Sequence, residues 1–157
     1  MSKLRIISIS KYIITALSII IVAVLGSVFV NLGMDWYSSV NKPSMWVPSF
    51  VFPIVWSVIY VVFGVILFSL IKNNKLNIKL TILFILNGII NILWCLVFFT
   101  LANPIVGLVL IIANVLLAVM LVYNILSKGN AWYYFSLIYP LWVSIATTLN
   151  LAIWILN

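Results

Sequence analysis

Residues 36–56 read WYSSVNKPSMWVPSFVFPIVW, and this stretch decides how the rest of the chain is interpreted. It contains three of the seven tryptophans, three of the five prolines and Lys42, and it follows Asp35, the only acidic residue. Long apolar segments flank it on both sides. We interpret residues 33–48 as a structured lid loop, and the remainder as the first half of a helix that lines a pocket.

The composition places the chain in a lipid bilayer. Hydrophobic residues make up 67% of it and charged residues 6%, with a mean hydropathy of +1.38. Soluble domains are about 45–50% apolar and about 25% charged, so a water-soluble core could not hide this much apolar surface. The net charge of +7 could suggest a nucleic-acid partner. Because the basic residues flank apolar runs, they are better interpreted as topology signals, and no nucleic acid is expected.

A helix that crosses a bilayer needs about 20 mostly apolar residues. The sequence contains five such segments, and Gly, Pro and Asn mark the breaks between them. We therefore predict an all-α membrane protein, a bundle of five transmembrane helices in a single domain, 1–157, with spans at 10–32, 49–71, 79–100, 104–126 and 132–155. The first span could be a secretory signal, but its apolar run is too long and lacks a small-residue cleavage site, which favours a retained helix.

Basic residues are distributed unequally between the two sides of this predicted bundle. With five spans, Lys42 falls on one side, beside Asp35, and the other seven fall on the opposite side: Lys3, Arg5, Lys11, Lys72, Lys75, Lys79 and Lys128. Cytoplasmic loops carry the excess of Lys and Arg. We therefore expect an integral multi-pass protein of the cell membrane, with its N-terminus in the cytoplasm and its C-terminus outside.

Three of the predicted spans each place aromatic side chains on one face, because a helix repeats its face every three to four residues. Two of these faces also carry amides. The faces are Phe52, Trp56, Tyr60 and Phe63; Asn87, Asn91, Trp94 and Phe98; and Tyr139, Trp142, Ala146 and Asn150. The amides are either interhelical hydrogen-bonding groups or ligand contacts, since amides in a membrane are costly without partners.

Depth separates the tryptophans into two groups. Four lie at span ends, where anchoring at the membrane interface explains them: Trp36, Trp46, Trp132 and Trp154. Trp56, Trp94 and Trp142 lie about 9 Å or more below an end at 1.5 Å per residue, too deep for the interface. They either pack between helices or face lipid, or they form the wall of a flat apolar cavity; small residues are the usual mediators of helix packing in lipid.

A second face of the third span carries small residues that would let another helix approach. It consists of Gly88, Ile92, Cys95 and Phe99. We take this face as the candidate interface of a homodimer.

Conventional catalysis has no candidate residues. The chain has no His, one Cys and one carboxylate, which lies in the lid loop. These counts exclude a general acid–base pair, a nucleophilic triad, an intramolecular disulfide and a multi-cysteine metal site. We expect no metal site and no required cofactor, so any chemistry would have to come from a bound ligand.

The motifs resemble those of the tryptophan-rich sensory proteins, also called translocator proteins or peripheral benzodiazepine receptors. That family carries W-Y-x-x-L-x-K-P-x-W-x-P-P followed by F-x-x-V-W-x-x-L-Y, L-N-x-x-W with F-F in the third span, and Y-x-x-W-V-x-F-A-x-x-L-N in the fifth. Matching residues are Trp36, Tyr37, Lys42, Pro43, Pro48, Phe52, Val55, Trp56, Tyr60, Asn91, Trp94, Phe98, Phe99, Tyr139, Trp142, Val143, Ala146, Leu149 and Asn150. Met45 and Val47 depart from the pattern, and Pro140 stands two residues after the family position, which is Ile138 here.

The resemblance implies a five-helix bundle with a ligand pocket under the first loop. The ligands it implies are porphyrins such as protoporphyrin and haem, sterols and isoquinoline-type drugs, and some bacterial members resemble slow porphyrin-degrading photo-oxidases. The implied pocket includes Trp56, Asn91, Trp142 and Ala146, closed by Trp36 and Tyr37. The animal sterol motif needs a Tyr and a Lys or Arg in the last helix, and LNLAIWILN has neither.

These observations lead to a first hypothesis, a membrane receptor or carrier for porphyrins. The alternative is a light-dependent porphyrin-degrading photo-oxidase that uses the same pocket, with Trp56 and Trp142 as its oxidisable residues. A small-solute transporter is less favoured because the predicted spans contain no acid, and an accessory membrane subunit would bind no ligand. Lys42 could meet a porphyrin propionate, although a pair with Asp35 is the simpler expectation.

Overall fold

The structure is a computed structural model that describes residues 3–43 and 47–157, with side chains from residue 9 onward. All regular structure within these ranges is helical, which confirms the all-α prediction. The elements are α1 (Lys3–Leu32), α2 (Met34–Ser39), α3 (Val51–Lys72), α4 (Ile78–Cys95), the π-helix η1 (Leu96–Thr100), α5 (Pro104–Leu126), the 3₁₀-helix η2 (Ala131–Leu137) and α6 (Ile138–Leu156). Met45 and Trp46 lie outside the described residues.

Five of the described segments are long and apolar enough to cross a membrane, which confirms the predicted bundle. They are Ile9–Leu32, Val51–Lys72, Ile78–Thr100, Pro104–Leu126 and Ala131–Leu156. The third segment joins α4 to η1, and the fifth joins η2 to α6.

Asparagine side chains begin three of these helical segments. Asn77 and Asn103 each accept a hydrogen bond from the backbone N–H three residues later, at 2.9 and 3.0 Å. Pro104 follows at the first position of α5, where a helix does not need the missing N–H. Asn130 caps η2 by accepting from Trp132 at 3.1 Å. These caps satisfy helix-start donors that would otherwise be unpaired.

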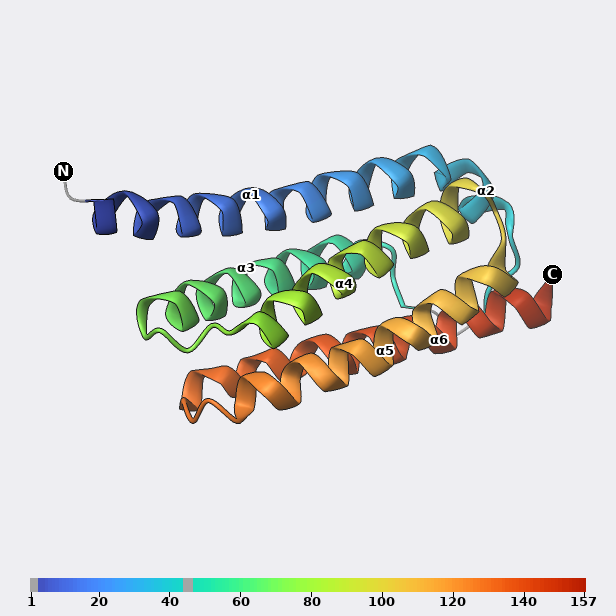
Figure 1. Cartoon of the computed structure of the whole chain (residues 1–157). Helices are drawn as coiled ribbons and strands as arrows, with labels where there is room; N and C mark the ends of the chain where they lie inside the picture. The colour runs from blue at the N-terminus through green and yellow to red at the C-terminus, as the bar shows by residue number, and fades with distance from the viewer. Residues whose placement is uncertain (1–2, 44–46) are drawn as a thin grey trace.

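The two ends of the bundle differ in charge. The α3–α4 and α5–η2 connections lie at the same end as the N-terminus, whereas α2 and the C-terminus lie at the other end (Figure 1). We call the first the lysine end, because its loops and helix ends carry Lys72, Lys75, Lys79 and Lys128. We call the second the lid end, and it contains Asp35 in α2.

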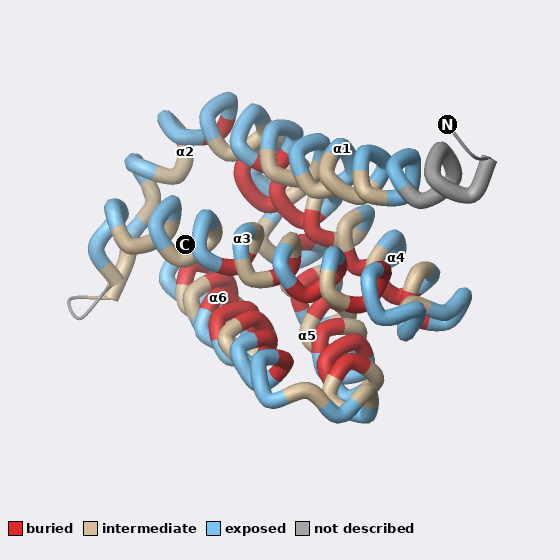
Figure 2. The backbone as a smooth tube through the Cα atoms, turned by 90° about the vertical axis from the view of Figure 1, so that its left-hand side faces the viewer, coloured by how far each residue is buried: buried red, intermediate tan, exposed pale blue. Residues whose placement is uncertain are grey.

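The long helices form a ring in the order α1, α4, α5, α6 and α3. Packing is closest between α4 and α5 and between α5 and α6, whereas α3 touches α6 only sparsely. Although α3 and α4 are consecutive, their backbones stay apart and they meet through side chains such as Phe63 and Phe84, whose ring centroids are 5.6 Å apart, while α1 contacts both. Figure 2 shows the buried positions on the inward faces of the ring, while α1 is mostly exposed or intermediate. In a bilayer that outer surface faces lipid.

Buried amides join α4, α5 and α6 through side-chain hydrogen bonds. Asn114 of α5 accepts from Asn87 of α4 at 2.8 Å and from the Tyr139 hydroxyl of α6 at 3.1 Å. Asn150 of α6 accepts from the Trp94 indole of α4 at 3.1 Å. It also donates to the first carbonyl of α5 at 2.7 Å. Asn87 and Asn150 therefore act as interhelical hydrogen-bonding groups. The sequence had left this role and direct contact with a ligand as the two alternatives.

At the lid end, α1 approaches the backbone of the π-helix closely. The i to i−5 hydrogen bond from Leu101 to Leu96, 2.9 Å long, is characteristic of the wider π-turn. Thr100 donates its hydroxyl to the Phe29 carbonyl of α1 at 2.7 Å. Gly33 lies directly against Phe99, and a Cβ at that position would overlap the Phe99 carbonyl group. Only a glycine permits this contact.

The face proposed for a homodimer is covered from within the chain. A Cβ on Gly88 would lie 3.0 Å from the side chain of Val22 in α1, and one on Gly26 would lie 3.6 Å from Cys95. Phe99 is likewise buried, against the end of α1. The proposed interface is therefore wrong, because α1 occupies it. A second copy would have to use another face.

We predict that Gly33→Ala strongly destabilises the protein. The methyl group overlaps backbone atoms of the π-helix, which no side-chain rotation can move aside. Overpacking usually costs about 1–3 kcal/mol, and overlap with backbone atoms places this variant at the upper end of that range or above it. The free energy of unfolding in a fixed detergent measures it.

Gly26→Ala, within α1, is the matched control, because its methyl group meets only side-chain atoms at 3.6 and 3.9 Å. Its effect should stay within about 1 kcal/mol. Equal stability of Gly33→Ala and wild type would contradict the close approach.

Candidate functional site

A cavity of about 290 Å³ lies inside the ring, and we call it the central cavity. Its lining comes from all five long helices: Ser18, Ile19, Ile21 and Val22 of α1; Trp56, Ile59, Tyr60, Phe63 and Leu67 of α3; Phe84, Ile85, Asn87, Gly88, Ile89, Asn91 and Ile92 of α4; Leu121 of α5; and Tyr139 of α6. The exposed lining residues belong to α1 and α4. The cavity therefore opens sideways between these two helices.

Aromatic rings form the α3 side of the central cavity. Trp56 stacks on Tyr60 with ring centroids 5.8 Å apart and an interplanar angle of 27°. The edge of Tyr139 meets Trp56 at 6.2 Å. Trp56 and Tyr60 share one face of α3, as their four-residue spacing predicts. Their rings therefore form one continuous aromatic wall.

The α4 wall of the cavity contains an acceptor without a hydrogen-bond partner. Asn91 is 3% exposed, and its Oδ1 has no hydrogen-bond partner among the described residues. A buried polar group left unpaired costs about 1–3 kcal/mol. Asn91 thus differs from Asn87, which lines the same cavity but donates to Asn114. An N–H group on a flat apolar ligand would satisfy the Asn91 oxygen.

A second, much smaller cavity lies at the lid end. Its volume is about 10 Å³, and it is lined by Tyr37, Phe52, Trp94, Phe98, Phe99, Ala146, Leu149, Asn150 and Ile153. Aromatic side chains fill the region: Trp94 stacks on Phe98 at 5.6 Å, and Trp36 of α2 meets Phe98 edge-on at 5.5 Å. Such a space holds about one water molecule, so the lid end is closed.

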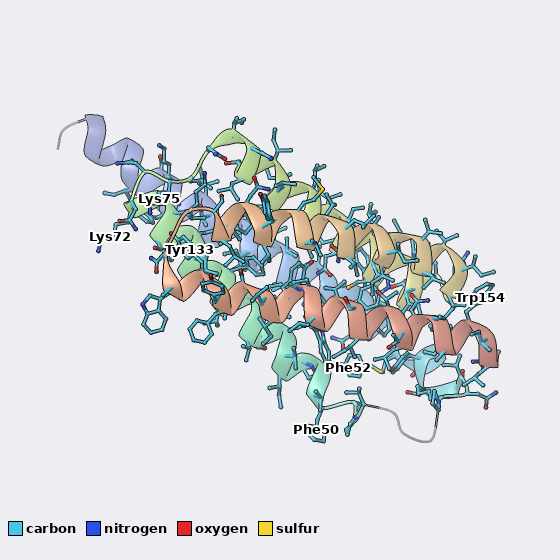
Figure 3. The ribbon with its side chains drawn as sticks, turned by 90° about the horizontal axis from the view of Figure 1, so that it is seen from below. Phe50, Phe52, Lys72, Lys75, Tyr133 and Trp154 are labelled. Atoms are coloured by element: carbon cyan, nitrogen blue, oxygen red, sulfur yellow. The ribbon has the colours of Figure 1, made fainter. Side chains whose placement is uncertain are left out.

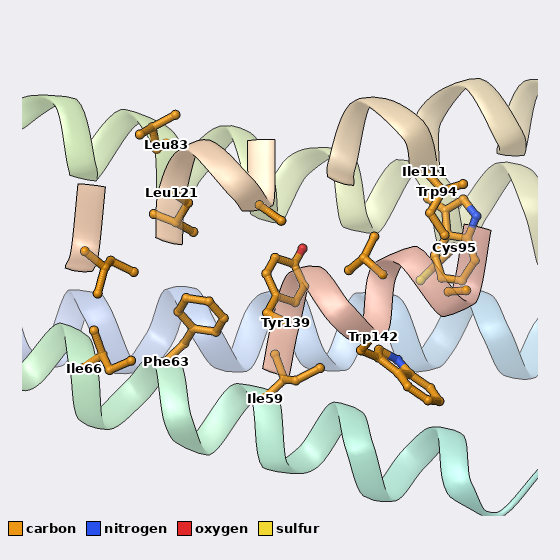
Figure 4. Close-up of a cluster of buried hydrophobic side chains, with 14 of the residues drawn as sticks. Ile59, Phe63, Ile66, Leu83, Trp94, Cys95, Ile111, Leu121, Tyr139 and Trp142 are labelled. Atoms are coloured by element: carbon orange, nitrogen blue, oxygen red, sulfur yellow. The ribbon is translucent and has the colours of Figure 1, made fainter. Parts of the chain in front are cut away.

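Trp142 lies along α6 between the residues that line the two cavities. Tyr139 precedes it by three residues and lines the central cavity, and Ala146 follows it by four and lines the lid-end cavity. Its indole projects toward α3 (Figure 4) and meets the edge of Phe52 at 5.4 Å. The Trp142 Nε1–H is buried and has no partner among the described residues. Phe52 and Trp142 therefore close the seam between α3 and α6.

The residues expected to bind ligand separate into three groups in the structure. Five line the central cavity: Trp56, Tyr60, Asn87, Asn91 and Tyr139. Six line the lid-end cavity: Tyr37, Phe52, Trp94, Phe98, Ala146 and Asn150. Trp36 and Trp142 line neither and instead pack against Phe98 and Phe52. The expected site thus follows α3, α4 and α6 across two adjoining spaces.

Sequence reasoning missed the contributions of α1 and α5. The α1 residues in the cavity wall are ordinary apolar or small side chains that carry no signal of their own. Asn114 of α5 does have a recognisable signal in the sequence. It is 1% exposed and hydrogen-bonded to two neighbouring helices. A lone amide in the middle of an apolar span needs a partner, so it could have been found.

The lid packs on the bundle through its aromatic residues, whereas its lysine bonds within the lid. Lys42 donates from Nζ to the carbonyls of Tyr37 and Val40, the latter at 3.2 Å, and its Nζ lies 4.5 Å from the Tyr37 ring centroid. Partial burial lowers the pKa of Lys42 below its usual value. Lys42 forms no ion pair with Asp35 within the described structure, so the simpler of the two expectations for this lysine is wrong. Its own loop supplies its partners.

Comparison with known proteins extends over nearly the whole chain. A model of the TspO/MBR family matches residues 14–155. Tryptophan-rich protein TspO of Archaeoglobus fulgidus is 32% identical over 157 residues, which cover 96% of this chain and 99% of that protein. Tryptophan-rich protein TspO of Chlorobaculum tepidum is 33% identical over 140 residues, 84% of this chain and 86% of that protein. Protein CrtK of Rhodobacter capsulatus is 28% identical over 128 residues, 78% of each.

The five-helix architecture, the tryptophan-rich stretch that forms the lid and begins α3, and the match over residues 14–155 agree. The chain belongs to the TspO/MBR family of membrane proteins.

Proposed function

We propose that this protein is a membrane receptor or carrier for porphyrins and similar flat apolar ligands, which bind in the central cavity. The observation that carries the proposal is the aromatic wall formed by Trp56 stacked on Tyr60, in the same cavity as the unpartnered acceptor of Asn91. Tetrapyrroles combine a large flat π surface with pyrrole N–H groups. Offset stacking on indole adds about 0.5–1.5 kcal/mol beyond area burial, and the Asn91 oxygen is an acceptor available inside the cavity.

A macrocycle requires more room than the central cavity offers. Its volume of about 290 Å³ lies at the lower limit of ordinary ligand pockets, which hold about 300–1,000 Å³. The seam between α3 and α6 has the sparsest packing of the ring, and Phe52 and Trp142 close it. Separation of these two rings would join the central cavity to the lid-end cavity and expose the Trp142 N–H to the ligand.

Porphyrin breakdown in light is the second candidate function. Trp56 lines the cavity and would lie beside a bound porphyrin. In this scheme the excited porphyrin passes its energy to dissolved O₂, and the reactive oxygen that results oxidises the macrocycle and the nearby indoles of Trp56 and Trp142. The protein supplies position and exclusion of water, and no resident cofactor is required.

We predict that Trp142→Phe leaves the protein folded but weakens protoporphyrin binding about threefold to tenfold, equivalent to about 0.7–1.4 kcal/mol of lost stacking and N–H contact. Fluorescence titration in the dark measures this loss. Trp154→Phe, at an exposed position on the same helix, is the control and should bind as wild type does.

Illumination of the same samples separates the two candidate functions. If the porphyrin absorption bands disappear in wild type, the photo-oxidase is supported. In that case Trp142→Phe should lose them more slowly than its lower porphyrin occupancy alone explains. Stable bands support the receptor or carrier. Unchanged porphyrin affinity in Trp142→Phe would contradict the role of the α3–α6 seam.

Lys42 is proposed to meet a carboxylate of the ligand at the lid end. Its ammonium group has only backbone carbonyls and the Tyr37 ring as partners, and it carries no carboxylate partner in the described structure. Lys42→Ala should therefore weaken binding of protoporphyrin, which has two propionates, more than binding of an uncharged isoquinoline. Parallel titrations of the two ligands measure the difference, and equal losses would exclude a role for the propionate.

We also propose that the lysine end faces the cytoplasm. Lys72, Lys75, Lys79 and Lys128 lie together there, and the positive-inside rule assigns such loops to the cytoplasmic side. A Cys introduced at Asn157 in a Cys95→Ala background should be labelled by an impermeant maleimide added outside intact cells. Labelling only after the cells are opened would reverse the orientation.

A further inference from the structure

A second hollow, of about 520 Å³, lies on the outside of the bundle at the lysine end, between α3 and η2. We call it the outer groove. Val61 and Val65 of α3 form one side of it, and Trp132 and Phe135 of η2 form the other. All four side chains are more than half exposed. The groove therefore faces the surrounding lipid and is separate from the central cavity, with which it shares no lining residue.

The aromatic side of the outer groove is an ordered plate. Trp132 and Phe135 stack with ring centroids 5.7 Å apart and an interplanar angle of 24°. Below them Tyr133 is 1% exposed and hydrogen-bonds through its hydroxyl to Ser69 of α3 at 3.2 Å. This bond fixes η2 to α3, so the floor and the walls of the groove are held in position.

Lysines lie beyond the polar end of the outer groove, although none of them is among its lining residues. On α3, Val61, Val65 and Ser69 follow one another at four-residue spacing, and Lys72 continues this face one turn later. From the next loop, Lys75 donates to the Lys128 carbonyl at 2.6 Å, which joins the α3–α4 and α5–η2 connections at this end. Figure 3 shows Lys72, Lys75 and Tyr133 at the same end of the bundle.

No carboxylate of the chain can neutralise these lysines. The sequence contains a single acidic residue, Asp35, and it lies in α2 at the opposite end of the bundle. Near a membrane surface the available anions are lipid phosphates. Each lysine near the surface increases the affinity for an anionic lipid by about a factor of five. The charge at this end therefore favours an anionic lipid over a zwitterionic one.

We propose that the outer groove is a binding site for one anionic phospholipid of the adjacent leaflet. One acyl chain lies along Val61 and Val65 against the Trp132–Phe135 plate, and the phosphate lies by Lys72 and Lys128. The lined stretch of α3 from residue 61 to residue 69 extends about 12 Å at 1.5 Å per residue, enough to order the upper part of a chain. Lipid tails are as apolar as the groove, so the lysines provide the selectivity and the groove provides the fixed position.

Native mass spectrometry of the detergent-solubilised full chain tests the proposal. Phosphatidylglycerol and phosphatidylcholine with identical acyl chains are added separately, and the apparent dissociation constant of the first bound lipid is measured for each. We expect wild type to bind phosphatidylglycerol at least about fivefold more tightly. Equal affinities for the two lipids would overturn the proposal.

Two variants separate the groove from the charges. Val65→Trp fills the groove at a position that is 61% exposed and changes no charge; Lys72→Gln combined with Lys128→Gln removes two charges and leaves the groove intact. Val65→Trp should abolish most of the tight phosphatidylglycerol binding, and the double lysine variant should lose the preference over phosphatidylcholine. Thermal unfolding midpoints equal to that of wild type show that each variant is folded.

Matched controls make both results decisive. Val109→Trp places the same bulk at a lipid-exposed position of α5, and Lys42→Gln removes a lysine at the opposite end. Both should bind phosphatidylglycerol as wild type does. If Val65→Trp binds it normally, or if Val109→Trp loses it equally, attraction to the headgroup alone explains the preference and the groove site is wrong.

Discussion

The hydrogen bonds centred on Asn114 and Asn150 are the interactions on which the architecture depends. In lipid the hydrophobic effect does not drive helices together, so close packing and polar contacts between helices decide which of them associate. Here the amides and their partners link α4, α5 and α6 pairwise. Among the described side-chain contacts, α1 and α3 are joined to the bundle mainly through apolar packing and single polar contacts at its ends. The protein is thus a firm three-helix unit with two more loosely attached helices.

The central cavity lies where the firm unit meets the loosely attached helices. Asn87 and Asn91 face it from the firm side, and Trp56 and Tyr60 face it from α3. If the proposed ligand binds there, it would act on the packing of α1 and α3 without breaking the amide bonds. At the lid end Gly33 limits this freedom, because it holds α1 against the π-helix while α2 covers the aromatic cluster around Phe98.

Much of this organisation follows from the sequence alone. Five apolar segments define the spans because backbone polar groups in lipid must be paired within a helix. The aromatic faces of α3 and α4 follow from helical periodicity, and Trp56, Tyr60, Asn87 and Asn91 do lie around one space. The concentration of lysines at one end also follows from the order of the spans, since the loops after the second and fourth spans return to the side of the N-terminus.

Other features were decided only by the tertiary structure. The order of helices around the ring places α1 over the small-residue face of α4, which closes the face that a dimer would have used. Asn87 and Asn150 find protein partners, whereas the Asn91 oxygen does not, and this depends on where Asn114 and Trp94 lie in space. Periodicity identifies which residues share a face, but contacts between helices determine whether that face meets a neighbour, a cavity or lipid.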